Sequence, residues 1–367
     1  MGSAVHLWMT AVAVGLALFF AMNIGASGAA ATMGVAYGSG AVPRKVGLML
    51  AAVGVFAGAN LGGGEVVKTL GSGIVPSDLL TVQLVIIILL SATLTLFMAN
   101  LLGIPLSTSE VTVGAVVGVG VAYQTLFVNK VLVIVSFWVI IPVIAFAMAW
   151  VGGSIITYLE KRDGRWRGIG SGKWKRALTI AVVAMGVFEA FSAGMNNVAN
   201  AVGPLVGAGL ISAQSGIFWG GLFVSLGAIV LGSRVVETNG KKITNLTLLQ
   251  GALVSGTGGL LVTIASLFGL PVPLTQVTTT AIMGLGVAKR GFQKQERMTV
   301  IKILKVWLVS PLISLVVSYT LVKLFIEPDL FVIVLLLALL IATLGLKSLY
   351  QTVRTEKSVI NEDGGGI

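Results

Sequence analysis

The chain contains no cysteine, a single histidine and only 10% charged residues among its 367. Without cysteine it can form no disulfide and no thiolate metal site, and one histidine excludes a histidine-rich metal centre. A soluble domain carries about a quarter charged residues, so this chain has too few of them to cover its surface in water. An enzyme is not expected, since no nucleophile–base arrangement or nucleotide-binding motif is present. We therefore predict no cofactor and no metal.

Apolar residues take the place of the missing charges, at 56% of the chain and a mean hydropathy of +1.01. Runs such as 79–102 and 131–159 reach or exceed the ~20 residues that cross ~30 Å of hydrocarbon. The sequence thus predicts an all-α polytopic protein of roughly eleven spans in a lipid bilayer. The 48 glycines suit close helix packing and broken helices in lipid. No Lys or Arg precedes the first apolar run, so we interpret it as a span rather than a signal peptide.

The net charge of +11 is concentrated in two clusters that flank apolar runs. Seven Lys and Arg residues lie within 158–177, and six within 289–305. The positive-inside rule explains both clusters as cytoplasmic loops, and a nucleic-acid partner is not expected. This reading predicts a multi-pass protein of the cell (inner or plasma) membrane, with its N-terminus outside and the basic loop 161–176 in the cytoplasm.

Three blocks of sequence recur in the same order, which indicates two related halves. Residues 25–40 resemble 194–209 and residues 65–74 resemble 234–243, both at an offset of 169, while 103–120 resemble 269–286 at an offset of 166. We predict these regions: 1–160 as the first repeat, 161–176 as the basic loop, 177–325 as the second repeat, and 326–367 as a final span and tail.

The positions of the basic residues predict that the two repeats cross the membrane in opposite senses. Arg44 and Lys45 place the first span outside to inside, whereas its counterpart starts in the basic loop near Arg176 and runs outward. Inverted repeats with interrupted segments in corresponding places are the layout of a secondary transporter, whose substrate site lies near the midplane.

Hydroxyl and amide side chains gather at the two Gly/Pro-interrupted segments. Gly103 and Pro105 should break one helix, and a new half-helix should begin near Thr108. The free N–H groups and positive dipole end of such a half-helix form an anion site. Capping or interhelical bonding by Ser and Thr is the alternative reading. Both runs together predict substrate contacts from Ser107, Thr108, Ser109, Thr275, Gln276 and Thr278.

"GMNNVANAVGPLVG" (194–207) resembles the GANDVANA signature of the inorganic phosphate transporter family. "IPLSTSEVTVGAVVG" (104–118) is similar to that family's second signature, a proline followed by a Ser/Thr run and a His. The resemblance implies an inverted-repeat carrier for a tetrahedral oxyanion, driven by sodium or protons. It adds Asn196, Asn197 and Asn200 to the predicted substrate-binding residues, with Ser27 and Thr32 from the first-half motif.

The departures from these signatures bear on the substrate. The signature Asp falls on Gly28 and Asn197, and the signature His on Glu110 and Gln276. A carboxylate can accept a hydrogen bond from the proton that phosphate keeps at neutral pH, but it only repels fully ionised sulfate. The sequence is most similar to the sulfate permease branch of the family. We therefore expect a sulfate importer, with thiosulfate or phosphate left open as substrates, and a phosphate permease, an anion channel or a membrane sensor as alternatives.

Loss of the signature acids also favours protons over sodium as the coupling ion. Ionisable groups within spans are costly and default to functional roles, so Glu110 is the first candidate for proton coupling and Glu189 the second. Glu65 and Lys68 face the reversed pair Arg234 and Glu237 across the repeat, which we interpret as structural ion pairs or loop charges. A homodimer is left open.

Overall fold

The computed structural model describes residues 2–101, 106–162, 172–237, 246–292, 294–332 and 334–335. All regular structure in these ranges is helical, which confirms the predicted all-α class. The chain divides into two compact units, Met1–Tyr319 and Thr320–Ile367. The first unit carries every contact discussed below, and the second contains the end of α15 and an exposed Lys323–Glu327 ion pair at 3.0 Å.

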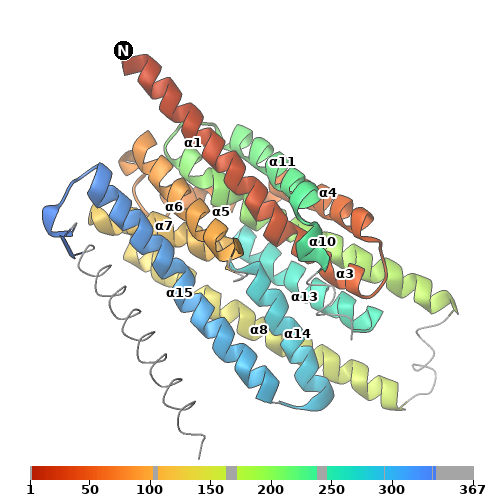
Figure 1. The fold of residues 1–367 in the computed structure, drawn as a ribbon. Helices are drawn as coiled ribbons and strands as arrows, with labels where there is room; N and C mark the ends of the chain where they lie inside the picture. Colours follow the sequence, from red (N-terminus) through yellow and green to blue (C-terminus); the bar gives the residue numbers. More distant parts are fainter. Residues whose placement is uncertain are drawn as a thin grey trace, which may run out of the picture. The chain divides into compact units, whose positions relative to one another are not determined.

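Figure 1 shows the helices in their order along the chain. Those of the first half are α1 (Gly2–Ile24), the π-helical turn η1 (Gly25–Ala29), α2 (Ala30–Thr32), α3 (Gly34–Gly38), α4 (Arg44–Gly62), α5 (Gly64–Ser72), the 3-10 turn η2 (Ser77–Leu79), α6 (Val82–Leu101), α7 (Thr108–Ala122) and α8 (Val128–Arg162). Those of the second half are α10 (Gly172–Gly207), α11 (Ala213–Leu231), α13 (Leu248–Leu267), α14 (Leu274–Arg290) and α15 (Lys294–Phe325).

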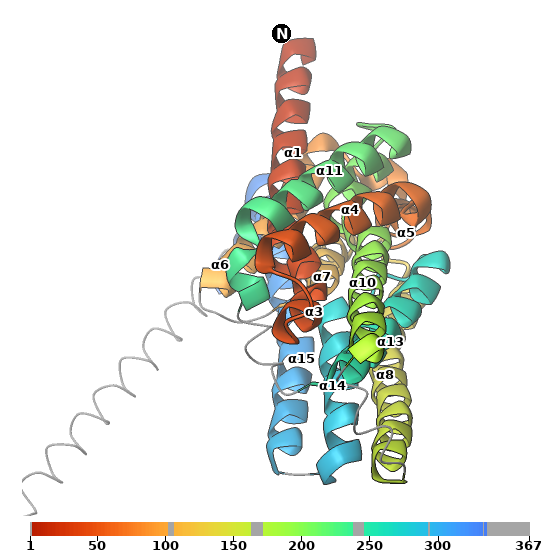
Figure 2. The ribbon, with the colours of Figure 1, turned by 90° about the vertical axis from the view of Figure 1, so that its right-hand side faces the viewer.

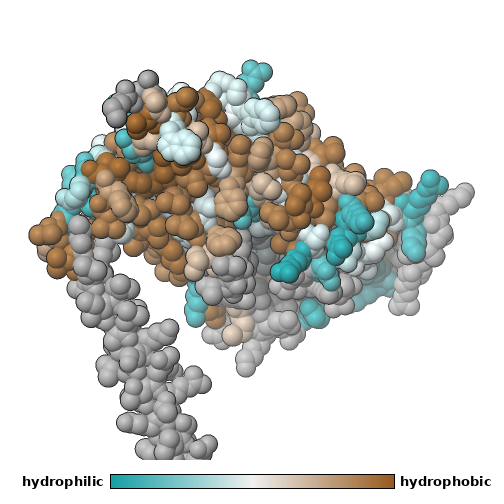
Figure 3. Space-filling view, turned by 45° about the horizontal axis from the view of Figure 1, so that its top comes forward, coloured by the Kyte–Doolittle hydropathy of each residue, from teal (hydrophilic) through white to brown (hydrophobic). Residues whose placement is uncertain are grey.

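Eight helices of the described ranges are long and apolar enough to cross a membrane, and α7 is a shorter apolar helix. Large apolar side chains such as Leu7, Trp8 and Phe331 are exposed on the surface, and hydrophobic side chains cover most of the face in Figure 3. Such an apolar surface suits lipid rather than water. The chain is therefore a multi-pass membrane protein, while the count of about eleven spans and the sidedness of its ends stay predictions.

The helix bounds repeat at the offsets found in the sequence. Helix α11 begins and ends 169 residues after α4, and α13 begins and ends 166 residues after α6. Helices α14 and α15 likewise begin 166 residues after α7 and α8. The sequence blocks thus mark two halves that fold into the same order of helices.

Glycine contacts between the halves are reciprocal. A Cβ atom on Gly25 would overlap the backbone at Val224 of α11, and one on Gly194 would overlap the backbone at Val55 of α4. Two further glycines at the same offset make the equivalent exchange, Gly58 against Phe191 and Gly227 against Met22. Such swapped contacts are what a two-fold relation between equivalent surfaces produces. They support the two-repeat organisation, whereas the opposite sense of the halves in the membrane stays a prediction.

The halves differ where the signature motif lies. In the first half the stretch is interrupted by η1 and by the short helices α2 and α3, whereas the equivalent stretch of α10 is one continuous helix. Both stretches nevertheless end alike, with Gly40 and Gly209 at φ angles of 74° and 67°. Glycine is favoured there because a side chain resists positive φ, and the following N–H bonds five residues back close each helix end.

The second predicted helix break is present between α13 and α14. Residues 268–273 are irregular, and Gly269 has a φ of 69°. Trp138 of α8 donates to the Pro271 carbonyl at 2.8 Å, and a Cβ on Gly269 would lie 2.8 Å from the Thr69 hydroxyl of α5. The irregular backbone is therefore covered by protein, as membrane depth requires. Gly103 and Pro105 lie outside the described residues, but α7 begins at Thr108 as predicted.

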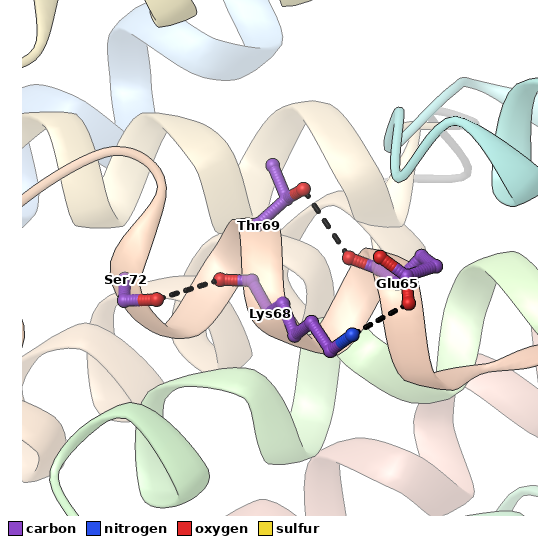
Figure 4. Close-up of polar contacts among 4 residues, drawn as sticks. All are labelled: Glu65, Lys68, Thr69 and Ser72. Carbon is purple, nitrogen blue, oxygen red and sulfur yellow. Dashed lines mark hydrogen bonds and ion pairs between the residues drawn. The ribbon is translucent and has the colours of Figure 1, made fainter.

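Three of the four predicted loop charges, Glu65, Lys68 and Glu237, form surface pairs, and for Arg234 the interpretation stays a prediction. Figure 4 shows Glu65 and Lys68 paired on α5, at 2.6 Å, and Arg44 meets Glu237 at 3.5 Å. Exposed pairs of this kind contribute little stability. They fit the structural interpretation rather than a site.

Helix α10 lies at the centre of the first unit. It packs against α4 and α5 on one side and against α13 on another, and α14 packs against α8 (Figures 1 and 2). This arrangement brings the middle of α10 to the N-terminal ends of the two half-helices, α7 and α14.

The close backbone contacts predict a sharp cost for added bulk. Gly58→Ala should lower the thermal unfolding midpoint of the detergent-solubilised protein by several degrees, because the methyl group must push α4 away from α10 at ~1–3 kcal/mol. Gly15→Ala is the control, since a Cβ there meets nothing within 4 Å. A Gly58 variant that melts at or above the parent's midpoint would contradict the close approach.

Candidate functional site

Three asparagines lie on one buried face of α10. Asn196, Asn197 and Asn200 are at most 3% exposed, and their spacing of one and three residues sets them side by side on the helix. Because buried amides need hydrogen-bond partners, the neighbouring helices must supply them.

The first turn of α7 supplies part of these partners. Asn200 Nδ2 donates to Thr108 Oγ1 at 3.3 Å and to Ser109 Oγ at 3.2 Å. Thr108 Oγ1 donates to Asn197 Oδ1 at 3.5 Å, and Ser109 Oγ to Asn196 Oδ1 at 3.4 Å. These five residues, which we call the amide–hydroxyl cluster, are all buried.

Asn196 also binds the irregular connection before α14. Its Nδ2 donates to Ser266 Oγ at 3.0 Å and to the Leu270 carbonyl at 2.9 Å. Its Oδ1 accepts from the Val272 N–H at 3.1 Å, and Ser109 Oγ donates to the Val272 carbonyl at 3.2 Å. One side chain thus ties α10, α13 and the helix break together.

The cluster is uncharged and rich in donors. Because α7 starts at Thr108, the backbone N–H groups of its first turn have no carbonyl partner within the helix, and the Ser107 side chain caps one of them. The Asn200 Oδ1 atom is buried without a partner in the described part of the chain. Gly28 approaches from the first half, where a Cβ would lie 3.3 Å from Asn197 Nδ2. Neutral donors at a helix N-terminus suit an anion.

Glu110 is fully buried on the next position of α7 but turns away from the cluster. Gln276 Nε2 of α14 donates to one carboxyl oxygen at 2.5 Å, and the Ser310 hydroxyl of α15 donates to the other. No Lys or Arg pairs with Glu110 in the described ranges. Glu110 and Gln276 are equivalent positions of the two halves. Because they touch, they lie close to the approximate two-fold axis that relates the halves.

Glu189 is buried at a separate place, in the middle of α10. Its Oε1 accepts a hydrogen bond from Thr278 Oγ1 of α14 at 2.6 Å. Thr278 is therefore a partner of this carboxyl group rather than of the amide–hydroxyl cluster. The described residues contain no group of three or more His, Cys, Asp and Glu that could hold a metal ion.

The remaining predicted substrate residues bond elsewhere. Ser27 and Thr32 donate to carbonyls of their own helical stretch, at 3.0 and 2.7 Å. The Ser107 side chain caps α7 by accepting from the Glu110 N–H at 3.4 Å. Thr275 is half-buried in the first turn of α14. Their contact with a substrate stays a prediction.

Two hydroxyl groups at these sites were not predicted from the sequence. Ser266 holds Asn196, and Ser310 holds Glu110. Each shares its helix with at least one other serine and lies 70 or 200 residues from its partner. The only available signal was weak, namely that Ser266 precedes the Gly/Pro-interrupted segment.

Comparison with known proteins places this arrangement in a family. The family model described as "Phosphate transporter family" matches residues 24–318. The sulfate permease CysP of Bacillus subtilis is 55% identical over 98% of this chain and 100% of its own length. A putative phosphate permease of Thermococcus kodakarensis is 27% identical over 83% of this chain and 94% of its own length. A solved structure titled "The sodium-dependent phosphate transporter" shares the fold, with a TM-score of 0.74, 24% identity, and coverage of 87% of this chain and 100% of that chain.

The hydrogen bonds that Asn196 donates predict that replacing its amide by a carboxylate will destabilise the protein. Asn196→Asp should destabilise the protein by about 1–3 kcal/mol per lost bond, because a carboxylate cannot donate to Ser266 or to the Leu270 carbonyl. Thermal unfolding in detergent measures this change. Asn60→Asp is the control, since Asn60 lies on the exposed face of α4 and bonds only its own helix. Equal midpoints for the two variants would refute the assigned contacts.

Proposed function

The chain belongs to the phosphate transporter family, and we propose that it imports sulfate across the cell membrane together with protons, by alternating access. A membrane transporter rather than an enzyme is what the family match and the relatives' names indicate. The substrate and the coupling ion rest on the site itself.

The observation that carries the proposal is the absence of acid from the amide–hydroxyl cluster. Gly28 and Asn197 stand where the family signature has Asp, and they lie against each other. A dianion without a proton needs donors only, and a carboxylate facing it would repel it strongly in a low-dielectric site. Sulfate meets this requirement, whereas hydrogen phosphate brings a proton that would find no carboxylate acceptor.

The relatives agree with this chemistry. The relative named a sulfate permease is 55% identical, while those named putative phosphate permeases are about half as similar, at 27% for the archaeal example. Phosphate is the second candidate substrate, favoured by the family description and by the solved neighbour's title.

The charges of the helix ends support the proposed orientation. Arg44 and Lys45 lie at the start of α4, and a second set of basic residues follows α8 and precedes the apolar part of α10. If these ends face the cytoplasm, the N-terminus is outside and the two halves are inverted. The central part of that basic loop, residues 163–171, lies outside the described residues.

Counterflow in proteoliposomes tests transport and substrate together. Liposomes loaded with unlabelled sulfate should accumulate labelled sulfate transiently, which marks a carrier and excludes a pore. Unlabelled sulfate should compete far better than phosphate at pH 7. Better competition by phosphate would indicate a phosphate carrier instead. Absence of the transient accumulation would indicate a channel.

The selectivity argument predicts the effect of restoring the signature acid. Asn197→Asp should weaken sulfate uptake more than tenfold and narrow its advantage over phosphate, because the carboxylate repels sulfate and accepts a hydrogen bond from hydrogen phosphate. Labelled uptake with each anion as competitor measures the ratio. Asn60→Asp adds the same charge on the exposed face of α4 and should leave the ratio unchanged. If Asn197→Asp preserves the parental preference, the acid-free site does not select sulfate.

Energetics require a coupling ion. Sulfate enters with two negative charges against a potential that is negative inside, at ~2.3 kcal/mol per charge per 100 mV. Uptake without cations would therefore run backwards in an energised cell. Glu110 adjoins Ser109 of the cluster, is buried without a cation and has partners that are all neutral. Protonation there would remove a negative charge as the anion arrives, so each ligand would favour the other.

Glu110→Gln should lower sulfate accumulation under an inward proton gradient by about tenfold per pH unit, because each coupled proton contributes ~1.4 kcal/mol per pH unit. Exchange of sulfate down its own gradient should continue, since Gln resembles the protonated acid. The measurement is steady-state labelled sulfate in liposomes that are acidic outside. Unaltered accumulation by the Gln variant would remove Glu110 from the coupling mechanism.

A further inference from the structure

Glu189 is an ionisable group that the anion site does not use. It lies near the middle of the apolar span Trp174–Gly207 and is 1% exposed. The position equivalent to Glu189 in the first half is Phe20, so the repeat does not require an acid here. An ionisable residue at this depth defaults to a function.

Only neutral hydroxyl groups lie beside the Glu189 carboxyl group. Thr278 donates to its Oε1 at 2.6 Å, and Oε2 is buried without a partner at bonding distance among the described residues. Ser255 of α13 is the second hydroxyl beside this carboxyl group, and it is buried as well. A proton on Oε2 would remove the buried negative charge, and the two neighbouring hydroxyl groups can bond either form of the acid.

No charged group compensates an ionised Glu189. Helix α13, which covers the carboxyl group, contains no ionisable residue. The ionisable residues on the other helices that pack against α10 and on α14, which contacts Glu189 directly, are His6 on α1, Tyr37 on α3, Arg44 and Lys45 on α4, Glu65 and Lys68 on α5, Glu110 on α7, and Lys289 and Arg290 on α14. None of them contributes a charge interaction to Glu189. The cation that neutralises this carboxylate must therefore come from outside the described protein.

Both buried acids contact the same half-helix. Glu110 meets α14 at Gln276 and Glu189 meets it at Thr278, two positions further along. Helix α14 also begins at the break that Asn196 holds through Leu270 and Val272. A movement of α14 would therefore affect the anion site and both carboxyl groups at once.

We propose that Glu189 is a second proton-binding site, so that Glu110 and Glu189 together carry two protons with each sulfate dianion. This inference rests on the proposed sulfate–proton symport and sets its stoichiometry. A proton fits better than a sodium ion, because a proton needs one carboxyl oxygen whereas a hard metal ion needs several oxygen ligands, and only the hydroxyls of Thr278 and Ser255 accompany this carboxyl group in the described residues. Import with two protons moves no net charge.

The test measures whether membrane potential acts on transport. Purified protein is reconstituted into sodium-free liposomes, acidic outside, and an inside-negative potential is set with a potassium gradient and ionophore. Wild-type accumulation of labelled sulfate should not change with the potential. Glu189→Gln should carry one proton per sulfate, so ~100 mV should lower its accumulation ratio about 40-fold.

Ser192→Ala is the matched control, because Ser192 lies one turn from Glu189 and bonds α13 at Gly259 without contacting the carboxyl group. It should remain insensitive to the potential. Should Glu189→Gln fail to fold, Ser255→Ala replaces it: loss of a hydroxyl that stabilises the ionised carboxylate should move half-maximal uptake to higher pH. An unchanged or more acidic midpoint would contradict the assignment.

The outcomes separate the two proposals. If wild type does not accumulate sulfate in a proton gradient, the proposed symport fails. If wild type is driven by protons but Glu189→Gln is as insensitive to potential as wild type, only the second site fails. A parallel assay adds sodium outside the liposomes at equal pH on both sides. If sodium rather than acid drives wild-type uptake and the Glu189 variant loses that response, the site binds sodium and the proton assignment is overturned.

Discussion

The close approach of helix backbones at four glycines is the constraint on which the rest of the structure depends. Gly25, Gly58, Gly194 and Gly227 bring α1, α4, α10 and α11 together without side chains between them. That contact fixes α10 in the interior, where its three asparagines can meet broken helices. Irregular backbone survives at membrane depth only where protein covers it, and the 268–273 connection is covered by Trp138 and by Asn196. The same helix packing that buries α10 therefore also provides hydrogen-bond partners for the irregular backbone.

The repeat made much of this arrangement predictable from the sequence. Equal offsets located the paired helices, and Pro and Gly before a Ser/Thr run located the start of α7 at Thr108. The signature stretch located the asparagines, although not the hydroxyls they would bond. Repetition alone cannot say which equivalent positions touch. Glu110 and Gln276 do touch because they lie beside the two-fold relation, and that fact emerges only from the packed helices.

Contacts made by individual serines were beyond sequence reasoning for a different reason. Ser266 and Ser310 lie in apolar helices, where serine is common and has many roles. Their partners are set by how α13 and α15 rotate against α10 and α7, and that rotation depends on large apolar side chains distributed along the whole interface. Ser27 and Thr32 show the converse case. Their positions follow from the repeat, but η1 changes the local helix, and both hydroxyls bond their own backbone.

The two halves are similar in fold but unequal in chemistry. Positions equivalent to Asn196, Asn197 and Asn200 are Ser27, Gly28 and Ala31, so only the second half presents amides. The asparagines therefore form a single polar cluster rather than two equivalent ones, and Glu110 and Glu189 lie outside it. Neutral donors leave the cluster uncharged when it is empty, which avoids a fixed midplane cation that would hold a dianion too tightly to release it.

This separation of donors from acids has a consequence for the proposed cycle. An empty carrier with both carboxylates ionised bears two negative charges at membrane depth. A carrier loaded with sulfate and two protons bears the same two charges, now on the anion, because both acids are neutral. Since the two forms that reorient carry equal charge in opposite directions, the effects of the membrane potential on the two steps cancel over the cycle. The proton gradient and the sulfate gradient alone would then set the direction of transport.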